Sequence, residues 1–269
     1  MKETKKIYLT PKQEFTVPIE LDNIIPEKII EAKSNLKDLK IWEGNREVPL
    51  GSLFDIKGEI ADTAADQQIV FENSTFRMRR IGQGLSKGEI IIQGDAGSHL
   101  GSEMTGGSIK VSGNADHWVG MEMTGGSIEI KGNAGNHLGA AYWGNWKGMK
   151  GGKIVVHGNT GIETGSWMAG GIIEVKGQSG DFLGIHMVSK KALIIAGEID
   201  RRAGAQMKNG TIIVLSNHAS MLPSFAKKET IEIYEDEEKE MKISGPFDVF
   251  IGDYTESKKP KGKILVKTG

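Results

Sequence analysis

One glycine-punctuated pattern occurs seven times in succession between residues 82 and 222. Two clear copies read GSEMTGGSIKVSG, from Gly101, and GMEMTGGSIEIKG, from Gly120. The copies begin at Gly82, Gly101, Gly120, Trp146, Gly165, Gly184 and Gly204. The period is therefore 19 residues, interrupted by a seven-residue insertion at 140–146 and by one extra residue near Lys190-Lys191. A fixed period of this length indicates a solenoid of stacked coils.

Each copy contains a short stretch in which apolar, mostly β-branched residues alternate with other types, as in a strand with one buried face. The alternating apolar pairs are Ile90/Ile92, Ile109/Val111, Ile128/Ile130, Ile154/Val156, Ile173/Val175, Leu193/Ile195 and Ile212/Val214. A further inward position is expected at Leu85, Met104, Met123, Met149, Met168, Met187 and Met207. Such short strands cannot bury that face alone, so neighbouring copies must stack, and 19 residues leave no room for a helix in each copy. The sequence predicts a mainly β fold, a right-handed parallel β-helix with ~19-residue coils.

Four segments are predicted along the chain. Residues 1–50 lack the repeat and are expected to form a small α+β N-terminal cap. Residues 51–81 are expected to be irregular first coils, and residues 82–222 the seven-repeat β-helix. Residues 223–269 are expected to be a C-terminal β extension. We expect the two ends to cover the open sheet edges of the rod, because uncovered edges favour pairing between molecules.

Local signals give more detail at the two ends. Pro26 with an acidic neighbour predicts the start of a short helix, and Gly44-Asn45 between two apolar stretches predicts a hairpin. The alternating stretch at 54–58 is interpreted as an irregular first coil. The sequence YEDEEKE at 234–240 is interpreted as an exposed acidic loop, and 245–252 and 263–267 as terminal strands.

Composition excludes several function classes. The formal net charge is −1, so the chain offers no basic excess for nucleic acid. It has no cysteine, which excludes thiolate-bound iron–sulfur clusters, cysteine zinc sites and a cysteine nucleophile within this chain. The first residues lack the apolar segment of a signal peptide, and no run of about 18 apolar residues is present. We expect a cytoplasmic protein without a membrane span.

No catalytic, cofactor-binding or metal site is predicted in this chain. The six histidines are His99, His117, His137, His157, His186 and His218. Two of them, His99 and His137, share a register position, but Trp118 lies between them and the backbones are expected to be about 9–10 Å apart. The acid–base pairs His117/Glu122 and His157/Glu174 have nothing to fix their orientation. The Gly-Gly pairs open strands rather than helices, which argues against a phosphate site.

The candidate functional residues are interface candidates. Tyr142, Trp143 and Trp146 lie on the inserted loop, and large aromatic side chains on a projecting loop are typical interface anchors. Trp118, Trp167 and Phe182 are expected to extend the same surface. The alternative is that the loop folds back and packs on the flank of the rod. A second candidate is the basic cluster Arg77, Arg79 and Arg80, either a solvated face or a docking patch for an acidic partner surface.

The chain resembles the C subunits of formylmethanofuran dehydrogenases over nearly its whole length. The similarity includes LTP at 9–11, VPIE at 17–20, RIG at 80–82, AYWGNWKGM at 141–149 and GIHM at 184–187. The chain departs from the family repeat at Leu85, at Lys190-Lys191 and at Ser216, which affects local coil geometry. The glycine repeats are more generally similar to the β-helical region of the large glutamate synthase subunit.

The resemblance implies a function at the level of a complex. The family's enzyme reduces carbon dioxide with low-potential electrons and attaches the formyl group to methanofuran, the first step of methanogenesis from that gas. It implies partner subunits that hold a tungsten- or molybdenum-pterin, an amidohydrolase-type metal centre and the iron–sulfur clusters of ferredoxin-like chains. The implied role of this chain is a non-catalytic scaffold, without a cofactor of its own, in a large hetero-oligomer.

Three other functions remain open from the sequence. The chain resembles the C subunit of the formyltransferase/hydrolase complex almost as closely. A glutamate-synthase-like ammonia-handling module would need glutaminase and flavin domains from a partner. A stand-alone β-helical enzyme acting on a polysaccharide would usually present clustered carboxylates in a groove, whereas the outward positions here mix lysine, glutamate, serine and apolar residues.

Overall fold

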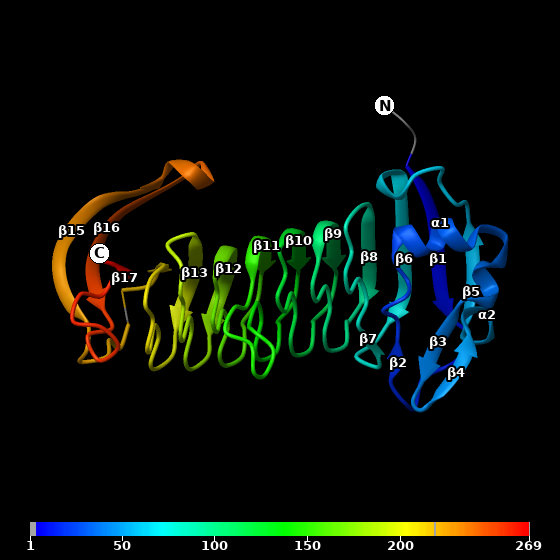
Figure 1. Cartoon of the computed structure of the whole chain (residues 1–269), viewed down its shortest axis with the longest axis horizontal. Coiled ribbons are helices and arrows are strands. Elements are labelled where there is room, and N and C mark those ends of the chain that lie inside the picture. The colour runs from blue at the N-terminus through cyan, green and yellow to red at the C-terminus, as the bar shows by residue number, and fades with distance from the viewer. Residues whose placement is uncertain (1–3, 218, 269) are drawn as a thin grey trace.

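A computed structural model describes residues 4–217 and 219–268 of the chain. The chain is elongated, and one large sheet runs along its length (Figure 1). The order of the strands in this sheet is β15-β16-β17-β14-β13-β12-β11-β10-β9-β8-β6-β1-β5. In the described part of the chain, no helix is long and apolar enough to cross a membrane.

Each copy of the repeat contributes one strand to this sheet. The strands are β8 (Glu89–Gly94), β9 (Thr105–Val111), β10 (Gly125–Ile130), β11 (Lys150–Val156), β12 (Gly170–Ser179), β13 (Ala192–Ile199) and β14 (Thr211–Val214). Neighbouring copies pair in parallel, for example Ile109 opposite Ile128, and Ile128 opposite Ile154. A second parallel ladder of isolated bridges joins Ala96, Ala115, Ala134, Thr160 and Ser179. The chain therefore makes equivalent contacts with its neighbours twice in each copy.

The predicted inward positions form the core. The residues of the methionine position, from Leu85 to Met207, are fully buried in every copy. So are the strand pairs such as Ile90/Ile92 and Ile154/Val156. Unbranched thioethers suit this place because they adapt to the irregular space between short strands. One continuous apolar cluster runs from the N-terminal region through the repeats.

The predicted register is wrong in one copy. Ile194 and Ala196 pair with Ile173 and Val175 and are buried in the core, whereas Leu193 and Ile195 face the opposite side of the sheet. The extra residue near Lys190-Lys191 precedes this strand, and a shift of one residue moves every side chain to the other face. Sequence alternation alone did not reveal the shift because residues 192–196 are all apolar.

A ladder of side chains explains the glycine that closes each repeat. The Oδ1 atoms of Asp95, Asn114, Asn133 and Asn159 each accept a hydrogen bond from a backbone N–H in the next copy, at 2.7, 2.9, 2.8 and 2.9 Å. A Cβ at Gly113, Gly132, Gly158 or Gly177 would collide with one of these oxygens. Within the described residues, the ladder runs as far as Gln178.

The N-terminal region joins the large sheet through β1 (Lys5–Pro11), which pairs in parallel with β6 (Gln67–Ser74). A smaller sheet has the order β4-β3-β2-β7. Its strands are β2 (Ile19–Glu20), β3 (Lys40–Glu43), β4 (Arg46–Pro49) and β7 (Met78–Arg79); the helical elements are α1 (Pro26–Ala32), η1 (Lys33–Asp38), α2 (Leu50–Leu53) and η2 (Ala64–Asp66). The predicted helix and hairpin are therefore confirmed.

Residues 54–58 do not form a first coil, contrary to the prediction. They form β5 (Phe54–Gly58), which runs antiparallel to β1 at one edge of the large sheet. The short α2 turns the chain back before this strand, so its alternation comes from one buried sheet face rather than from a repeat. Residues 69–73 lie in β6, which does pair in parallel with β8.

The C-terminal region is a long hairpin followed by one strand. Its elements are β15 (Ala226–Asp236), η3 (Glu237–Lys239), β16 (Met241–Gly252) and β17 (Gly262–Lys267). The two terminal strands are confirmed. The predicted acidic loop at 234–240 is wrong for Tyr234, Glu235 and Asp236, which belong to β15, whereas η3 and Glu240 do form the turn of the hairpin. The hairpin curves over the outer face of the sheet (Figure 1). There Phe247, Val249 and Leu265 pack on Leu193, Ile195 and Ile213.

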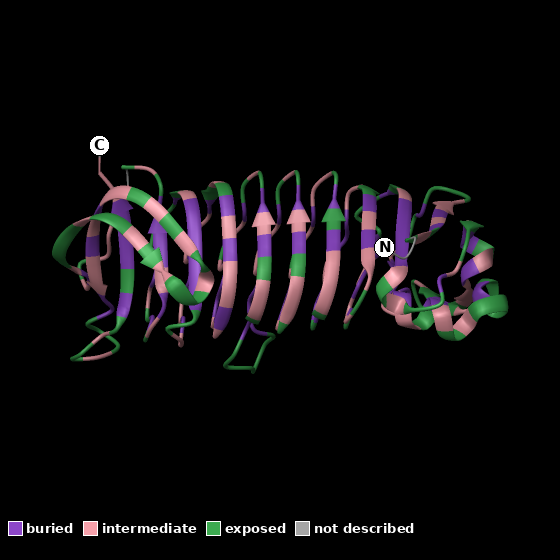
Figure 2. Cartoon of the chain, turned by 90° about the horizontal axis from the view of Figure 1, so that it is seen from above, coloured by how far each residue is buried: buried purple, intermediate pink, exposed green. Residues whose placement is uncertain are grey.

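Exposed and partly buried positions alternate with buried ones along the strands of the large sheet (Figure 2). On the outer face beyond the hairpin, several of the exposed charges are paired. Lys110 pairs with Glu89 at 2.7 Å, and Lys153 pairs with Glu174 at 3.3 Å. His157 lies 2.9 Å from Glu129. Exposed pairs of this kind contribute little stability, about 0–1 kcal/mol each.

Candidate functional site

Two rows of side chains line the flank that carries the inserted loop. The first row is Arg80, His99, Trp118, His137, Glu163, Phe182 and Arg202; the second is Glu103, Glu122, Trp167, His186 and Gln206. All of them have φ values between 54° and 65°, a region that costs a non-glycine residue roughly 1 kcal/mol. Hydrogen bonds between copies hold these corners, for example from the backbone N–H of Trp118 to the carbonyl of Asn136.

The rows bring aromatic rings into stacks. The ring centroids of Trp118 and His137 lie 4.2 Å apart with 18° between the planes, and those of His99 and Trp118 lie 6.2 Å apart with 6° between the planes. In the second row, Trp167 and His186 stack at 4.2 Å. These separations are close to the spacing of about 4.8 Å between strands. Equivalent corners of consecutive copies therefore place their rings face to face.

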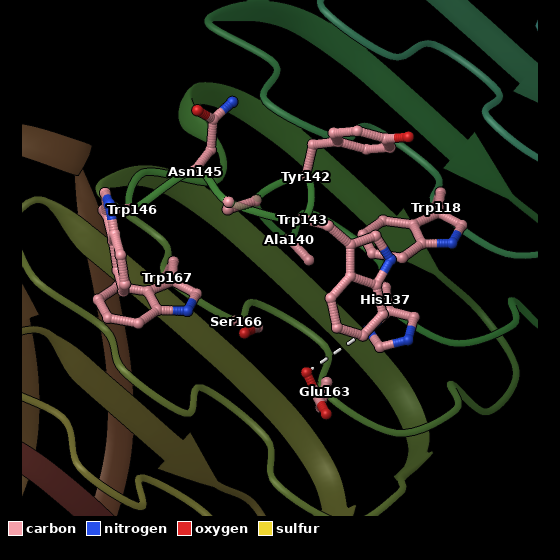
Figure 3. Close-up of a pocket in the computed structure, with 12 residues that line it drawn as sticks. Trp118, His137, Ala140, Tyr142, Trp143, Asn145, Trp146, Glu163, Ser166 and Trp167 are labelled. Atoms are coloured by element: carbon pink, nitrogen blue, oxygen red, sulfur yellow. Dashed lines mark ion pairs between the residues drawn. The ribbon is translucent and has the colours of Figure 1, made fainter.

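The inserted loop packs on both rows. Trp143 lies 6.0 Å from both Trp118 and His137, and the ring of Trp146 meets Trp167 edge-on at 4.9 Å (Figure 3). Tyr142 lies 6.2 Å from Trp118. These contacts show that the loop packs on the flank, which is the second of the two interpretations of the sequence.

The same loop still presents its aromatic side chains to solvent. Trp143 is 74% exposed, Trp146 68% and Tyr142 50%. Glu122 anchors the loop, since its Oε1 accepts hydrogen bonds from the backbone N–H of Tyr142 at 3.0 Å and from the side chain of Asn145 at 2.5 Å. The loop is thus held in place while large apolar surfaces remain uncovered, which is the arrangement of an interface anchor.

A cleft of about 130 Å³ lies between the two ends of the loop. Trp118, His137 and Trp143 stand on one side of it, and Trp146 and Trp167 on the other (Figure 3). Ala140, Ser166 and Glu163 also line it. Small-molecule and cofactor sites usually measure about 300–1,000 Å³, so this cleft suits a single side chain better than a cofactor.

The carboxylate of Glu163 in this cleft has no charged partner among the described residues. Its nearest basic group is Nδ1 of His137 at 3.6 Å. Burial lowers the pKa of His137, an effect that the Glu163 carboxylate only partly opposes. The imidazole is therefore neutral at pH 7, and the negative charge of Glu163 stays unbalanced.

The three candidate arginines do not act as one cluster in the structure. Arg80 belongs to the first row and is tied to Glu20 at 3.0 Å and to Gln83 at 3.0 Å. A second hollow, which Arg80 and Tyr142 both line, brings Arg80 to the loop-bearing flank. Arg79 is half-buried and Arg77 exposed in the segment before it.

The histidines do not form a metal site in the described part of the chain. No three His, Cys, Asp or Glu side chains gather there closely enough to hold a metal ion. Trp118 separates His99 from His137, as expected. His218 lies outside the described residues.

Neither of the acid–base pairs considered from the sequence forms. Instead, His157 contacts Glu129, and Nδ1 of His117 accepts a hydrogen bond from the backbone N–H of Asn136 at 2.9 Å. His117 thereby occupies a place in a backbone-supporting ladder, since Asn136 in turn accepts from the backbone of Ile162.

Sequence reasoning missed Glu163, and it considered Glu122 only as an acid–base partner of His117. A signal for Glu163 was present, because a large or charged residue stands two places before each opening glycine, and before Gly139 in the copy with the insertion: Arg80, His99, Trp118, His137, Glu163, Phe182 and Arg202. These large or charged residues at one fixed phase mark the first row. The stacks within that row then follow from the spacing of the copies.

No protein-family model matches the chain. It is 47% identical, over 265 residues, to the C subunit of tungsten-containing formylmethanofuran dehydrogenase 2 from Methanococcus maripaludis, covering 96% of this chain and 95% of that one. It is 41% identical over 96 residues, 35% of this chain and 23% of the other, to the C subunit of molybdenum-containing formylmethanofuran dehydrogenase 1 from Methanothermobacter thermautotrophicus.

The fold matches a chain in the crystal structure of the formyltransferase/hydrolase complex from Methylorubrum extorquens in complex with methylofuran. The TM-score is 0.84 at 27% identity, with 97% of this chain and 100% of that chain covered. The fold similarity and the nearly full-length sequence identity agree in placing the protein. The chain belongs to the family of formylmethanofuran dehydrogenase C subunits.

Proposed function

We propose that this chain is a non-catalytic scaffold subunit of a cytoplasmic formylmethanofuran dehydrogenase. That complex would reduce carbon dioxide with low-potential electrons and fix it as N-formylmethanofuran. Its tungsten- or molybdenum-pterin, its iron–sulfur clusters and its amidohydrolase-type metal would reside in partner subunits. The observation that carries the proposal is the 47% identity over 96% of the chain to the C subunit of a tungsten-containing enzyme.

The scaffold role rests on the form of the exposed surfaces. A scaffold has to present fixed contact surfaces, and the loop at 140–146 is anchored by Glu122 yet uncovered on its outer side. The aromatic part of this surface is formed by Trp118, Tyr142, Trp143 and Trp146. The basic candidates are Arg77, Arg79 and Arg80, of which Arg80 lines a hollow together with Tyr142. We propose both groups as interface residues.

The architecture that supports this role is proposed to be a right-handed parallel β-helix. The parallel pairing of β8 to β14 and the second ladder of bridges support it. The cap would then comprise residues 1–50, the rod residues 82–222 and the C-terminal extension residues 223–269. Within residues 51–81, β6 would form the coil that pairs with the rod, since it runs parallel to β8. A rod of this kind holds distant partner surfaces at fixed separations.

A second candidate is a subunit of a formyltransferase/hydrolase complex. The structural match to such a complex, at a TM-score of 0.84, favours it. The two candidates differ in their partners: the first requires a tungsten or molybdenum subunit and electron-carrying subunits, the second does not. Purification of the tagged chain from its native cells, with metal analysis and mass spectrometry of the associated proteins, separates them.

Isolation of the chain without any such partner would contradict both candidates. The loop has its own test: replacing Trp143 and Trp146 by alanine should weaken assembly and leave the isolated chain folded. Trp42→Ala is the matched control, because Trp42 is 45% exposed on the hairpin of β3 and β4, far from the loop in sequence. Unchanged assembly of the double variant would show that the loop is internal packing.

A further inference from the structure

We propose that the cleft between Trp143 and Trp146 receives an arginine side chain from a neighbouring subunit of the complex. This inference rests on the scaffold role proposed above and gives its interface a chemistry. Its elements are two aromatic walls, an unbalanced carboxylate and a volume that fits one side chain.

The aromatic walls favour a flat cation. Trp143 and Trp146, which are 74% and 68% exposed, line opposite sides of the cleft (Figure 3). Trp118 and Trp167 also line it, but their faces are stacked against His99 and His137 and against His186. Indole faces attract a cation placed within about 6 Å of the ring, and tryptophan does so best. A guanidinium group is planar and more weakly hydrated than an ammonium group, so it stacks on such faces at a lower desolvation cost.

The carboxylate supplies the opposite charge. Glu163 lines the cleft, its side chain is 35% exposed, and its only close basic neighbour among the described residues is the neutral His137. A guanidinium donates paired hydrogen bonds to a carboxylate, a contact stronger than that of a single neutral donor. The cleft therefore lacks one cation, and arginine matches both its walls and its charge.

The same flank already shows this kind of contact within the chain. The guanidinium carbon of Arg202 lies 5.2 Å from the ring centroid of Phe182, and both residues belong to the first row. An arginine therefore stacks on an aromatic neighbour at the corner where the chain supplies one. At Glu163, one copy before Phe182, the charge and the rings are present without the arginine.

The chain's own Lys147 is the competing occupant. It lies next to Trp146, is exposed, and makes no ion pair with Glu163 in the described structure. It does not line the cleft in this structure. The experiment below distinguishes this lysine from an arginine of a partner.

The main test compares two matched carboxylates in the full complex. Glu163→Gln keeps the shape of the side chain and removes the charge, while Glu47→Gln does the same at an exposed carboxylate on β4, outside the candidate site. The measurement is the dissociation constant of the tagged full chain for the rest of the complex at several salt concentrations. We expect Glu163→Gln to weaken binding at least tenfold and to flatten its salt dependence, and Glu47→Gln to change it less than twofold.

A second pair of variants tests the walls. Trp143→Phe keeps a ring and should retain most of the affinity, whereas Trp143→Leu should lose as much as Glu163→Gln. Thermal unfolding of each isolated variant confirms that it folds. If Glu163→Gln and Trp143→Leu bind as the wild type does, the arginine proposal fails while the scaffold proposal stands. If the wild-type chain binds no subunit of such a complex, the scaffold proposal itself fails.

The partner arginine can be identified directly. The chain has no cysteine, so Lys147→Cys places a unique thiol beside the cleft for a maleimide–benzophenone cross-linker. We expect the cross-linked partner peptide to contain an arginine, whose change to glutamine weakens binding without adding to the effect of Glu163→Gln. A peptide without arginine, additive effects, or loss of the salt dependence in Lys147→Ala would overturn the proposal.

Discussion

Replacing Ile195 by lysine should detach the C-terminal hairpin from the outer face of the sheet, whereas replacing Val155 by lysine should leave the hairpin in place. The two positions lie in one line across the sheet, with Glu174 between them. They differ in their cover: Ile195 is 5% exposed beneath the hairpin, and Val155 is half-exposed on the open face. The same substitution therefore tests the presence of the hairpin and the corrected register together.

The expected magnitude follows from the burial of Ile195. Loss of its apolar contacts with Phe247 and Val249 costs about 1.5–3 kcal/mol, and an ammonium group under the hairpin adds a desolvation cost of several kcal/mol. Opening of the hairpin alone would return the ammonium group to water. The main core can stay folded when this happens, because the apolar cluster under the hairpin is separate from it. We expect the closed hairpin to lose at least about 3 kcal/mol, a rise of roughly 100-fold in the open population.

Hydrogen exchange followed by mass spectrometry measures this opening. Amides of β15 and β16 should exchange roughly 100-fold faster in Ile195→Lys, with β10 and β11 unchanged. In Val155→Lys the new ammonium lies beside Glu129 and Glu174, so exchange throughout the chain should match the wild type. Equal behaviour of the two variants would refute the placement of Ile195 beneath the hairpin.

Three further predictions concern the interior and the corners. Met149→Ala, at a fully buried position, should lower the free energy of unfolding by about 2–5 kcal/mol in chemical denaturation, and Met149→Leu by less than about 1.5; equal losses would contradict the packing argument. Asn133→Ala leaves the backbone N–H of Asn159 without its 2.8 Å partner and should cost about 0.5–1.5 kcal/mol, with an effect on hydrogen exchange confined to that corner; exchange like that of the wild type there would count against the ladder. Burial lowers the pKa of His99, with help from two nearby arginines, and burial also lowers that of His137. Both side chains are therefore neutral in the folded protein above about pH 6.5, and the free energy of unfolding should fall as the pH drops and they become protonated. The fall should be smaller in His99→Asn than in the wild type. Urea midpoints at pH 7.5 and 5.5 measure the difference, and an equal fall in both proteins would refute it.

The inserted loop and the first row show which parts of the candidate site the sequence predicts. The insertion at 140–146 and its aromatic residues stand out because they break a fixed period. The stack of His99, Trp118 and His137 follows from equal phase in consecutive copies. The cleft does not follow in this way, since it needs the loop conformation that brings Trp146 onto Trp167 and leaves Glu163 between the walls.

The sequence by itself determined the periodic part of this protein. A period of 19 residues, one alternating strand and one methionine position per copy leave stacking of the copies as the way to bury the apolar residues. The core confirms the predicted inward positions except Leu193 and Ile195. It also determined the family, since the motifs that carry the resemblance are local in the chain.

Tertiary structure decided what happens where the period fails. Residues 192–196 are all apolar, so alternation could not choose which of Leu193 and Ile194 faces the core; the pairing with β12 and the cover of the hairpin chose. The strand at 54–58 likewise takes its place from a partner distant in sequence, β1. Contacts between distant segments decide such cases because a local pattern states that a face is buried, but not which part of the chain buries it.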